Sequence, residues 1–143
     1  MRKVTSLLRE VKITFRWALY DREPLPVWTR QRLSLLGDAA HPMLPHLGQG
    51  ANQSIEDGMA LATILARTDR ATAPSALTAY ERLRRERVAQ VQRGARENGL
   101  RYDSAYSDLG VRDAEIAAHA AFRKRLYDHD VVPEAQAVAA ALA

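Results

Sequence analysis

The order of apolar and polar positions predicts a helical start and one strand near the N-terminus. Residues 4–11 could form one or two helical turns. Residues 13–20 are rich in β-branched and aromatic side chains with partial alternation, which is typical of a strand. The following stretch contains Pro24 and Pro26, which prevent regular strand pairing. The predicted strand is therefore expected to end before residue 21.

A second, shorter apolar run covers residues 32–36 and stops at Gly37. A run of this length that ends at a glycine predicts a buried strand. Such a strand usually has parallel neighbours, and no other segment of the chain supplies an obvious one. Its unpaired edge would favour self-association or binding to a partner chain.

Helical spacing of apolar residues dominates the rest of the chain. The pattern predicts helices over residues 53–67, 74–97 and 113–127, and a short alanine-rich helix over 133–143. The Asn98–Gly99 pair is expected to end the second of these helices. The fold class expected from these elements is mainly α with a few short strands (α+β).

Composition limits the possible classes of protein. The chain has 143 residues, of which 47% are hydrophobic and 27% charged, which suits a single folded domain and not a disordered chain. No apolar run approaches the roughly 18 residues of a membrane span, and no apolar core follows the first basic residues as in a signal peptide. The absence of cysteine excludes disulfides and thiolate chemistry, and it fits a cytoplasmic protein.

The net charge of +4 leaves nucleic-acid binding as an alternative. Seven arginines lie between Tyr80 and Arg101, and such a stripe could contact phosphates. Three glutamates interrupt the stripe, and no base-reading motif accompanies it. A solvated helix face is therefore the preferred interpretation. The histidines and acids also lack metal-ligand spacing, so no metal site is predicted.

Chemistry-bearing residues concentrate in the loop between the second strand and the first long helix. Asp38 follows the strand at its carboxyl end, and its carboxylate suits a ligand rich in hydroxyl groups. Gly37 permits close approach to the backbone. Gly48 and Gly50 precede a helix whose first N–H groups favour negative charge, and Asn52 adds an amide there. The loop therefore predicts a site for a polyhydroxylated, anion-forming ligand.

The same loop resembles the second flavin-binding motif of the flavoprotein aromatic hydroxylases, the salicylate-hydroxylase-like class A monooxygenases. The resemblance rests on Gly37-Asp38-Ala39-Ala40-His41 and on Pro45-His46-Leu47-Gly48-Gln49-Gly50. Flanking segments also resemble the family, so the likeness covers nearly the whole chain. It implies FAD as cofactor and NAD(P)H as reductant. In that family a flavin C4a-hydroperoxide hydroxylates a phenolic or aromatic substrate.

The resemblance also implies roles for single residues. Gly37 and Asp38 would meet the ribityl chain, with Asp38 accepting hydrogen bonds from its hydroxyls. Pro45 would lie beside the reactive flavin edge, and His46 would face the substrate as a base for a phenol, unless it is a structural loop histidine. The segment around the flavin ring would be Gly48, Gln49, Gly50, Ala51 and Asn52. The N–H groups of its last three residues would stabilise negative charge on the reduced flavin.

The chain departs from the family at one important point, because no Gly-x-Gly-x-x-Gly turn for the FAD pyrophosphate is present. The chain therefore resembles the C-terminal part of the FAD/NAD(P)-binding fold, without its N-terminal Rossmann unit. We expect a single partial domain. Residues 1–31 would be a remnant of the substrate-domain sheet and a linker, 32–68 the flavin-ring segment, and 69–143 the C-terminal helices.

Such a chain is expected to be inactive alone, which leaves its status as an enzyme open. The alternative is a non-enzymatic remnant, or a subunit that needs a partner chain with the Rossmann half. A second copy of the chain is the other possible partner.

Overall fold

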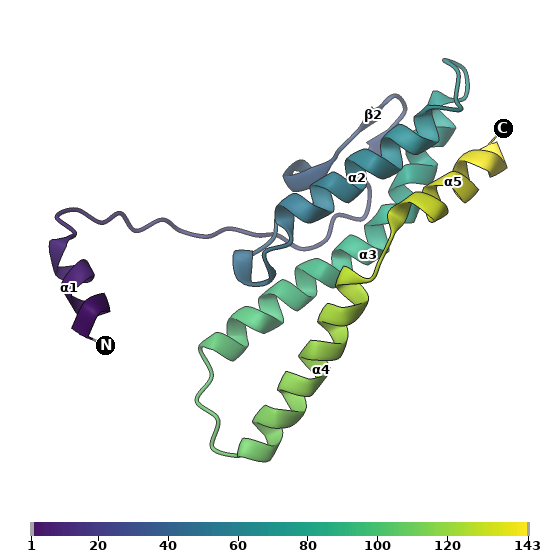
Figure 1. Ribbon diagram of the computed structural model, residues 1–143. Helices are drawn as coiled ribbons and strands as arrows, with labels where there is room; N and C mark the ends of the chain where they lie inside the picture. Colours follow the sequence, from purple (N-terminus) through teal and green to yellow (C-terminus); the bar gives the residue numbers. More distant parts are fainter. Residues whose placement is uncertain (1, 143) are drawn as a thin grey trace.

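The computed structural model describes residues 2–142, and helices make up most of it (Figure 1). This confirms the expected fold class, mainly α with a few short strands. The elements are listed here in chain order: helix α1 (Arg2–Glu10), strands β1 (Thr29–Arg30) and β2 (Leu33–Ser34), 3-10 turns η1 (Gly37–Ala39) and η2 (Pro45–Leu47), and helices α2 (Gly50–Leu65), α3 (Ala73–Tyr102), α4 (Leu109–Tyr127) and α5 (Val131–Leu142).

Helices α2, α3 and α5 pack side by side and form the core (Figure 1). Ala60, Ala76 and Ala135, one from each helix, have no exposed surface, so the three backbones approach one another closely. Tyr80 and Ile64 fill the space between them. Helix α4 runs back along the far half of α3, and the two form an arm that extends from this core (Figure 1).

The predicted buried strand over residues 32–36 is wrong in both length and burial. Strand β2 has two residues and pairs antiparallel with β1, with Thr29 opposite Ser34. Leu33 is 68% exposed. The cause is a tight turn in which Gln31 adopts a φ of 56°, which folds the chain back on itself and gives β2 a local partner.

The strand predicted over residues 13–20 is also absent. The backbone from residue 11 to Tyr20 runs away from the helical core and ends in α1 (Figure 1). Every residue in this stretch is exposed, because no other described segment pairs with it. The helical turns expected just before it are confirmed by α1.

Helix boundaries differ from the sequence expectation at several places, and α4, expected from residue 113, begins at Leu109. Helix α2 begins at Gly50, three residues early, and α5 begins at Val131. Helix α3 continues through Asn98 and Gly99, so the predicted stop is wrong. The pair serves packing instead: Asn98 Nδ2 donates to the His46 carbonyl at 2.7 Å, and a Cβ on Gly99 would lie 2.6 Å from the His46 ring.

A buried ionic cluster joins α2 and α3 to the turn η1. Arg84 on α3 is fully buried, and its Nε donates to Asp57 Oδ1 at 2.8 Å. Its two terminal nitrogens donate to Glu56 at 2.7 Å and to the Gln53 side chain at 2.9 Å. Asp57 Oδ2 lies 2.6 Å from His41 Nε2 and accepts the backbone N–H of Gly37 at 3.0 Å. We call Gln53, Glu56, Asp57, Arg84 and His41 the Arg84 cluster.

The Arg84 cluster changes the acidity of its carboxylates. Burial raises the pKa of Asp57, but the hydrogen bond from His41 and the Arg84 guanidinium outweigh it, so the pKa lies below its ordinary 3.8. The pKa of Glu56 is lowered as well: burial opposes the change, and Arg87 and Arg84 outweigh burial. Both groups add stability above their ordinary pKa values, and this stability is lost as the pH falls through the lower folded values.

No helix within residues 2–142 is both long and apolar enough to cross a membrane.

We expect Asp57→Asn to lower the free energy of unfolding by about 3–5 kcal/mol at pH 7, because it leaves the buried Arg84 short of one charge partner. The gap to the wild type should narrow as the pH falls below the ordinary pKa value of 3.8, because the unfolded chain then binds a proton at Asp57 before the folded protein does. Denaturant unfolding from pH 3 to pH 7 measures both effects. The control is Asp113→Asn, an exposed carboxylate paired with its neighbour Arg112, which should change stability by less than about 0.5 kcal/mol. Equal effects of the two variants would contradict the role of the cluster.

Two glycine variants test the reason why α3 continues past Asn98. Gly58 lies in α2 with no atom within 4 Å of an added Cβ, so Gly58→Ala should raise stability by about 0.5–1 kcal/mol. Gly99→Ala should lower stability despite the same gain in helix propensity, because the His46 ring must move. Thermal unfolding of both variants distinguishes these outcomes. If Gly99→Ala stabilises the protein as much as Gly58→Ala does, the packing explanation fails.

Candidate functional site

The loop between β2 and α2 is built from two short turns whose glycines are required by geometry. Gly37 has a φ of +59°, and a Cβ there would lie 2.8 Å from Ser54 Oγ. Its carbonyl accepts the N–H groups of Ala40 and His41 at 2.8 and 2.9 Å, which closes η1. Gly48 ends η2 with a φ of +62°, where an L side chain would be strained although space is open.

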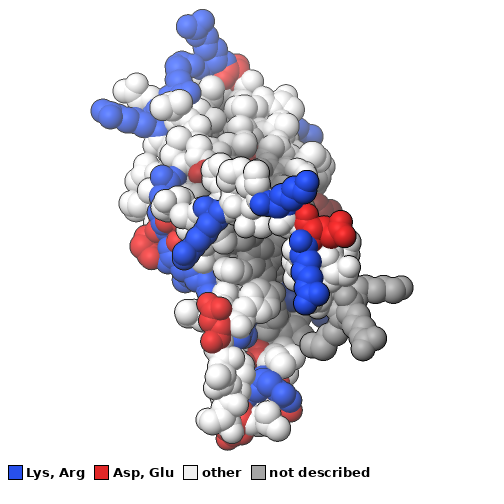
Figure 2. All heavy atoms as spheres, turned by 90° about the vertical axis from the view of Figure 1, so that its left-hand side faces the viewer, with Lys and Arg blue, Asp and Glu red and all other residues white. Residues whose placement is uncertain are grey.

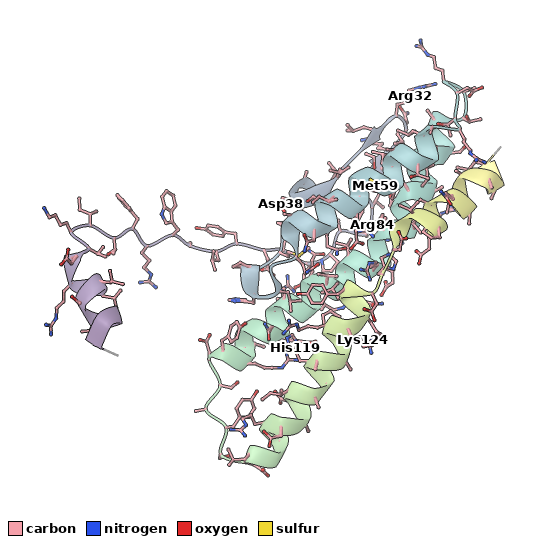
Figure 3. All side chains as sticks on the ribbon, viewed as in Figure 1. Arg32, Asp38, Met59, Arg84, His119 and Lys124 are labelled. Carbon is pink, nitrogen blue, oxygen red and sulfur yellow. The ribbon has the colours of Figure 1, made fainter. Side chains whose placement is uncertain are left out.

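Asp38 lies in the first turn of η1 and is exposed. Figure 3 shows it at the N-terminal end of α2, and a Cβ on Gly50 would lie 3.8 Å from its Oδ1. Among the side chains that the structure describes, those of residues 5–142, none forms a hydrogen bond or an ion pair with the Asp38 carboxylate. The structure therefore places a free acceptor beside the start of a helix.

The first turn of α2 supplies donors next to that acceptor. Gly50, Ala51 and Asn52 open the helix, and their N–H groups have no carbonyl four residues back within it. Gln49 precedes the helix, and its side chain makes no capping hydrogen bond. The helix dipole adds to the preference of these N–H groups for negative charge.

Side chains of α3 hold the loop and the segment around β1 in place. Gln92 Nε2 donates to the Pro42 carbonyl at 2.9 Å, and Asn98 holds the carbonyl of His46. Glu81 accepts the backbone N–H groups of Trp28 at 3.0 Å and of the next residue at 2.8 Å. These hydrogen bonds fix the backbone around the site, while Asp38 and the residues Ala51 and Asn52 at the start of α2 stay exposed.

Sequence reasoning missed these anchors. The arginine-rich helix was interpreted as a solvated face, and for Arg84 this is wrong, since the side chain has no exposed surface. The signal in the sequence was the polar residues at helical spacing on one side of α3: Glu81, Arg84, Gln92. On the face that Figure 2 shows, basic and acidic side chains are interspersed, with no continuous basic stripe.

His46 lies in η2 with its ring packed against α3. The ring is edge-on to Tyr102, with 5.7 Å between centroids, and it covers Gly99. The structure thus brings Gly37 and Asp38 together with the start of α2, whereas the contacts of the His46 ring are with α3. Pro45, the first residue of η2, is exposed.

The donor set fits the flavin that the sequence suggested. A free carboxylate suits ribityl hydroxyls, and the helix start suits the electron-rich side of the flavin ring. A metal ion is a poorer match, because residues 2–142 contain no group of three or more His, Asp or Glu side chains that could hold one.

Comparisons with known proteins agree with this geometry. Residues 16–95 match the model of a family described as an FAD binding domain. The chain is 48% identical over 96 residues to 3-amino-4-hydroxybenzoate 2-monooxygenase of Streptomyces platensis, which covers 67% of this chain and 24% of that protein. It is 38% identical over 129 residues to salicylate hydroxylase of Pseudomonas putida, which covers 88% of this chain and 30% of that protein.

Solved structures show the same relation. A salicylate hydroxylase in a substrate complex superposes with a TM-score of 0.78 and 33% identity, over 96% of this chain and 34% of the other. CtdE in complex with FAD superposes with a TM-score of 0.55 and 36% identity, over 81% of this chain and 26% of the other. The chain thus spans about a quarter to a third of the length of these relatives. It belongs to the FAD-binding domain family of the FAD-dependent aromatic monooxygenases, with FAD as the family's cofactor.

Proposed function

We propose that this chain forms the part of an aromatic monooxygenase that holds the ribityl chain and ring of FAD. The observation that carries the proposal is the unpartnered Asp38 carboxylate beside the open first turn of α2. An acceptor and a set of N–H donors side by side match a polyol joined to an electron-rich ring.

Each loop residue then has a defined task. Asp38 accepts hydrogen bonds from ribityl hydroxyls, and Gly37 lets the ligand approach the backbone. The N–H groups of Gly50, Ala51 and Asn52 favour the negative charge of the reduced ring. Gln49 and Gly48 shape the entry to this helix, and Pro45 borders the ring edge. When bound, FAD reduced by NAD(P)H supplies the activation of O₂ that hydroxylates an aromatic substrate.

The names of the relatives indicate an aromatic substrate for the whole protein. They include hydroxylases of 3-amino-4-hydroxybenzoate, 6-hydroxynicotinate and salicylate. We propose a phenolic or related aromatic substrate here. His46 is proposed as the group that takes the phenol proton. Its contacts with Gly99 and Tyr102 support the alternative task of holding η2 against α3.

A flavin titration tests the assignment. If the chain holds the ribityl and ring portions alone, FMN should bind about as tightly as FAD, because no Gly-x-Gly-x-x-Gly turn occurs in the sequence to hold the second phosphate and the adenosine. Asp38→Ala should weaken both about tenfold or more, since it removes charged hydrogen bonds to the ribityl chain. Flavin fluorescence quenching measures the affinities.

Asp113→Ala, at an exposed carboxylate on α4, is the matched control and should leave flavin affinity unchanged. Unchanged binding by Asp38→Ala would remove Asp38 from the site. The absence of flavin binding by the wild type would favour the second candidate function, a subunit that needs another chain.

That second candidate rests on residues 11–19. Side chains at odd positions there are apolar and 50–82% exposed: Val11, Ile13, Phe15, Trp17 and Leu19. Three of the four intervening positions carry Lys12, Thr14 and Arg16. Alternation of this kind belongs to a strand with one buried face, and such a face is costly to leave in water.

We propose that residues 11–19 form a strand when a sheet edge is available, as expected of a segment from a substrate-domain sheet. The occupant proposed is the remainder of such a relative's polypeptide, since the part that matches this chain is only 30% of the Pseudomonas putida salicylate hydroxylase. The Rossmann half would arrive with that polypeptide.

Co-expression tests this pairing. The chain should co-elute with the part of the Pseudomonas putida salicylate hydroxylase that lies outside the matching region. The double variant Phe15→Thr, Trp17→Thr should not, because it keeps strand propensity but removes the apolar face. Arg16→Thr, on the opposite face, is the control and should still co-elute. If the chain instead dimerises alone through the same two residues, self-association replaces the partner chain.

A further inference from the structure

A groove between α3 and α4 lies outside the loop between β2 and α2, which we call the flavin loop because we propose that it holds the flavin. Its cavity measures about 370 Å³, within the range of roughly 300–1,000 Å³ that is common for small-molecule sites. Three side chains provide its apolar surface: Tyr102 at the end of α3, Tyr106 in the loop that follows and Ile116 on α4. Tyr102 is 69% exposed and Ile116 55% exposed, so the apolar walls are open to a ligand.

The charged side chains at this groove are of one sign. Arg101, Arg112 and Arg123 line it, and no carboxylate among the described residues does. Arg112 is paired with its neighbour Asp113 at 2.7 Å. Arg101 lies 3.7 Å from Glu115 and 3.9 Å from Glu97, beyond hydrogen-bond distance from both.

Arg123 is the available cation. Within residues 2–142 it has no acidic partner, and its guanidinium carbon lies 5.7 Å from the centre of the Tyr127 ring. Stacking on a ring face leaves the edge of a guanidinium free to bind an anion.

The pKa of His119, which also lines the groove, reflects burial and the positive charge of the nearby arginines. Figure 3 marks it on α4, and its Nδ1 lies 3.1 Å from a terminal nitrogen of Arg101. Burial lowers the pKa of His119, and Arg101 and Arg123 lower it further, against an opposite effect of Glu97. The lowered pKa of His119 thus comes first from burial and then from the positive charge of Arg101 and Arg123, which line the same groove.

We propose that the groove between α3 and α4 binds an aromatic carboxylate, in addition to the flavin that the loop holds. The carboxylate pairs with the edge of the Arg123 guanidinium, which matches it in a two-pronged geometry. The ring packs between Tyr102 and Ile116, where an offset or edge-on arrangement is favourable. A neutral ring lacks the first contact, and inorganic phosphate lacks the second.

Calorimetric titration of the chain with sodium benzoate tests the proposal. Binding at about millimolar or tighter is expected for a ligand of this size. Arg123→Gln should weaken it about tenfold or more. Arg82→Gln, an exposed arginine of α3 outside the groove, is the matched control and should bind as the wild type does. Equal unfolding temperatures of the two variants establish that both are folded.

Three further titrations complete the test. Benzyl alcohol and inorganic phosphate should each bind at least tenfold more weakly than benzoate. Asp38→Ala should bind benzoate normally, because the flavin loop takes no part. The proposal is overturned by the absence of benzoate binding, by equal binding of phosphate or benzyl alcohol, or by loss of binding in Asp38→Ala. The last result would place the benzoate at the flavin loop.

Discussion

The buried ion pair between Arg84 and Asp57 is the interaction on which the loop and the helices both depend. Arg84 has no exposed surface, and a guanidinium in that position needs hydrogen-bond acceptors and negative charge around it. Each of its three nitrogens donates to a side chain of α2. The second carboxylate oxygen of Asp57 forms hydrogen bonds with His41 and with the N–H of Gly37 in η1. One carboxylate thereby connects the packing of α2 on α3 to the shape of the flavin loop.

Helix α3 holds β1, the loop before α2 and the turn η2 in place. Its polar side chains hold β1 through Glu81, the loop through Gln92 and η2 through Asn98. Its glycines allow close approach: a Cβ on Gly94 would lie 2.8 Å from the Phe122 ring of α4. Polar side chains and glycines together fix the position of α3 along its neighbours, because each hydrogen bond and each close contact forms at only one position along the helix axis.

The position of the loop was predictable from the sequence because its glycines mark its turns. Gly37 and Gly48 occupy positive φ, and Gly50 opens α2, so the glycine pattern reports the backbone directly. The start of α2 was placed three residues late, because helix ends carry weaker signals than helix centres.

What failed was set by distant contacts. The burial of Arg84 depends on three residues about thirty positions earlier, and a sequence pattern cannot separate such an arginine from its solvated neighbours. Gly99 looked like a helix end, and its reason is the ring of His46. Residues 13–20 have the composition of a strand, but a strand needs a neighbour, and the described chain offers none.

Asp38 and Asp57 illustrate how two carboxylates held by the same turn can differ: one is used within the fold, and the other is free for the ligand that we propose. Asp57 is fully buried and surrounded by donors, so its charge is neutralised within the fold. Asp38 is exposed and unpartnered, although it lies in the turn that Asp57 anchors through Gly37. A protein carboxylate binds a ligand's hydroxyl groups best when its backbone is fixed and no donor of the protein already occupies it. Any internal donor would compete with the ligand. The Arg84 cluster meets this requirement by fixing the backbone of η1 and leaving the Asp38 side chain free.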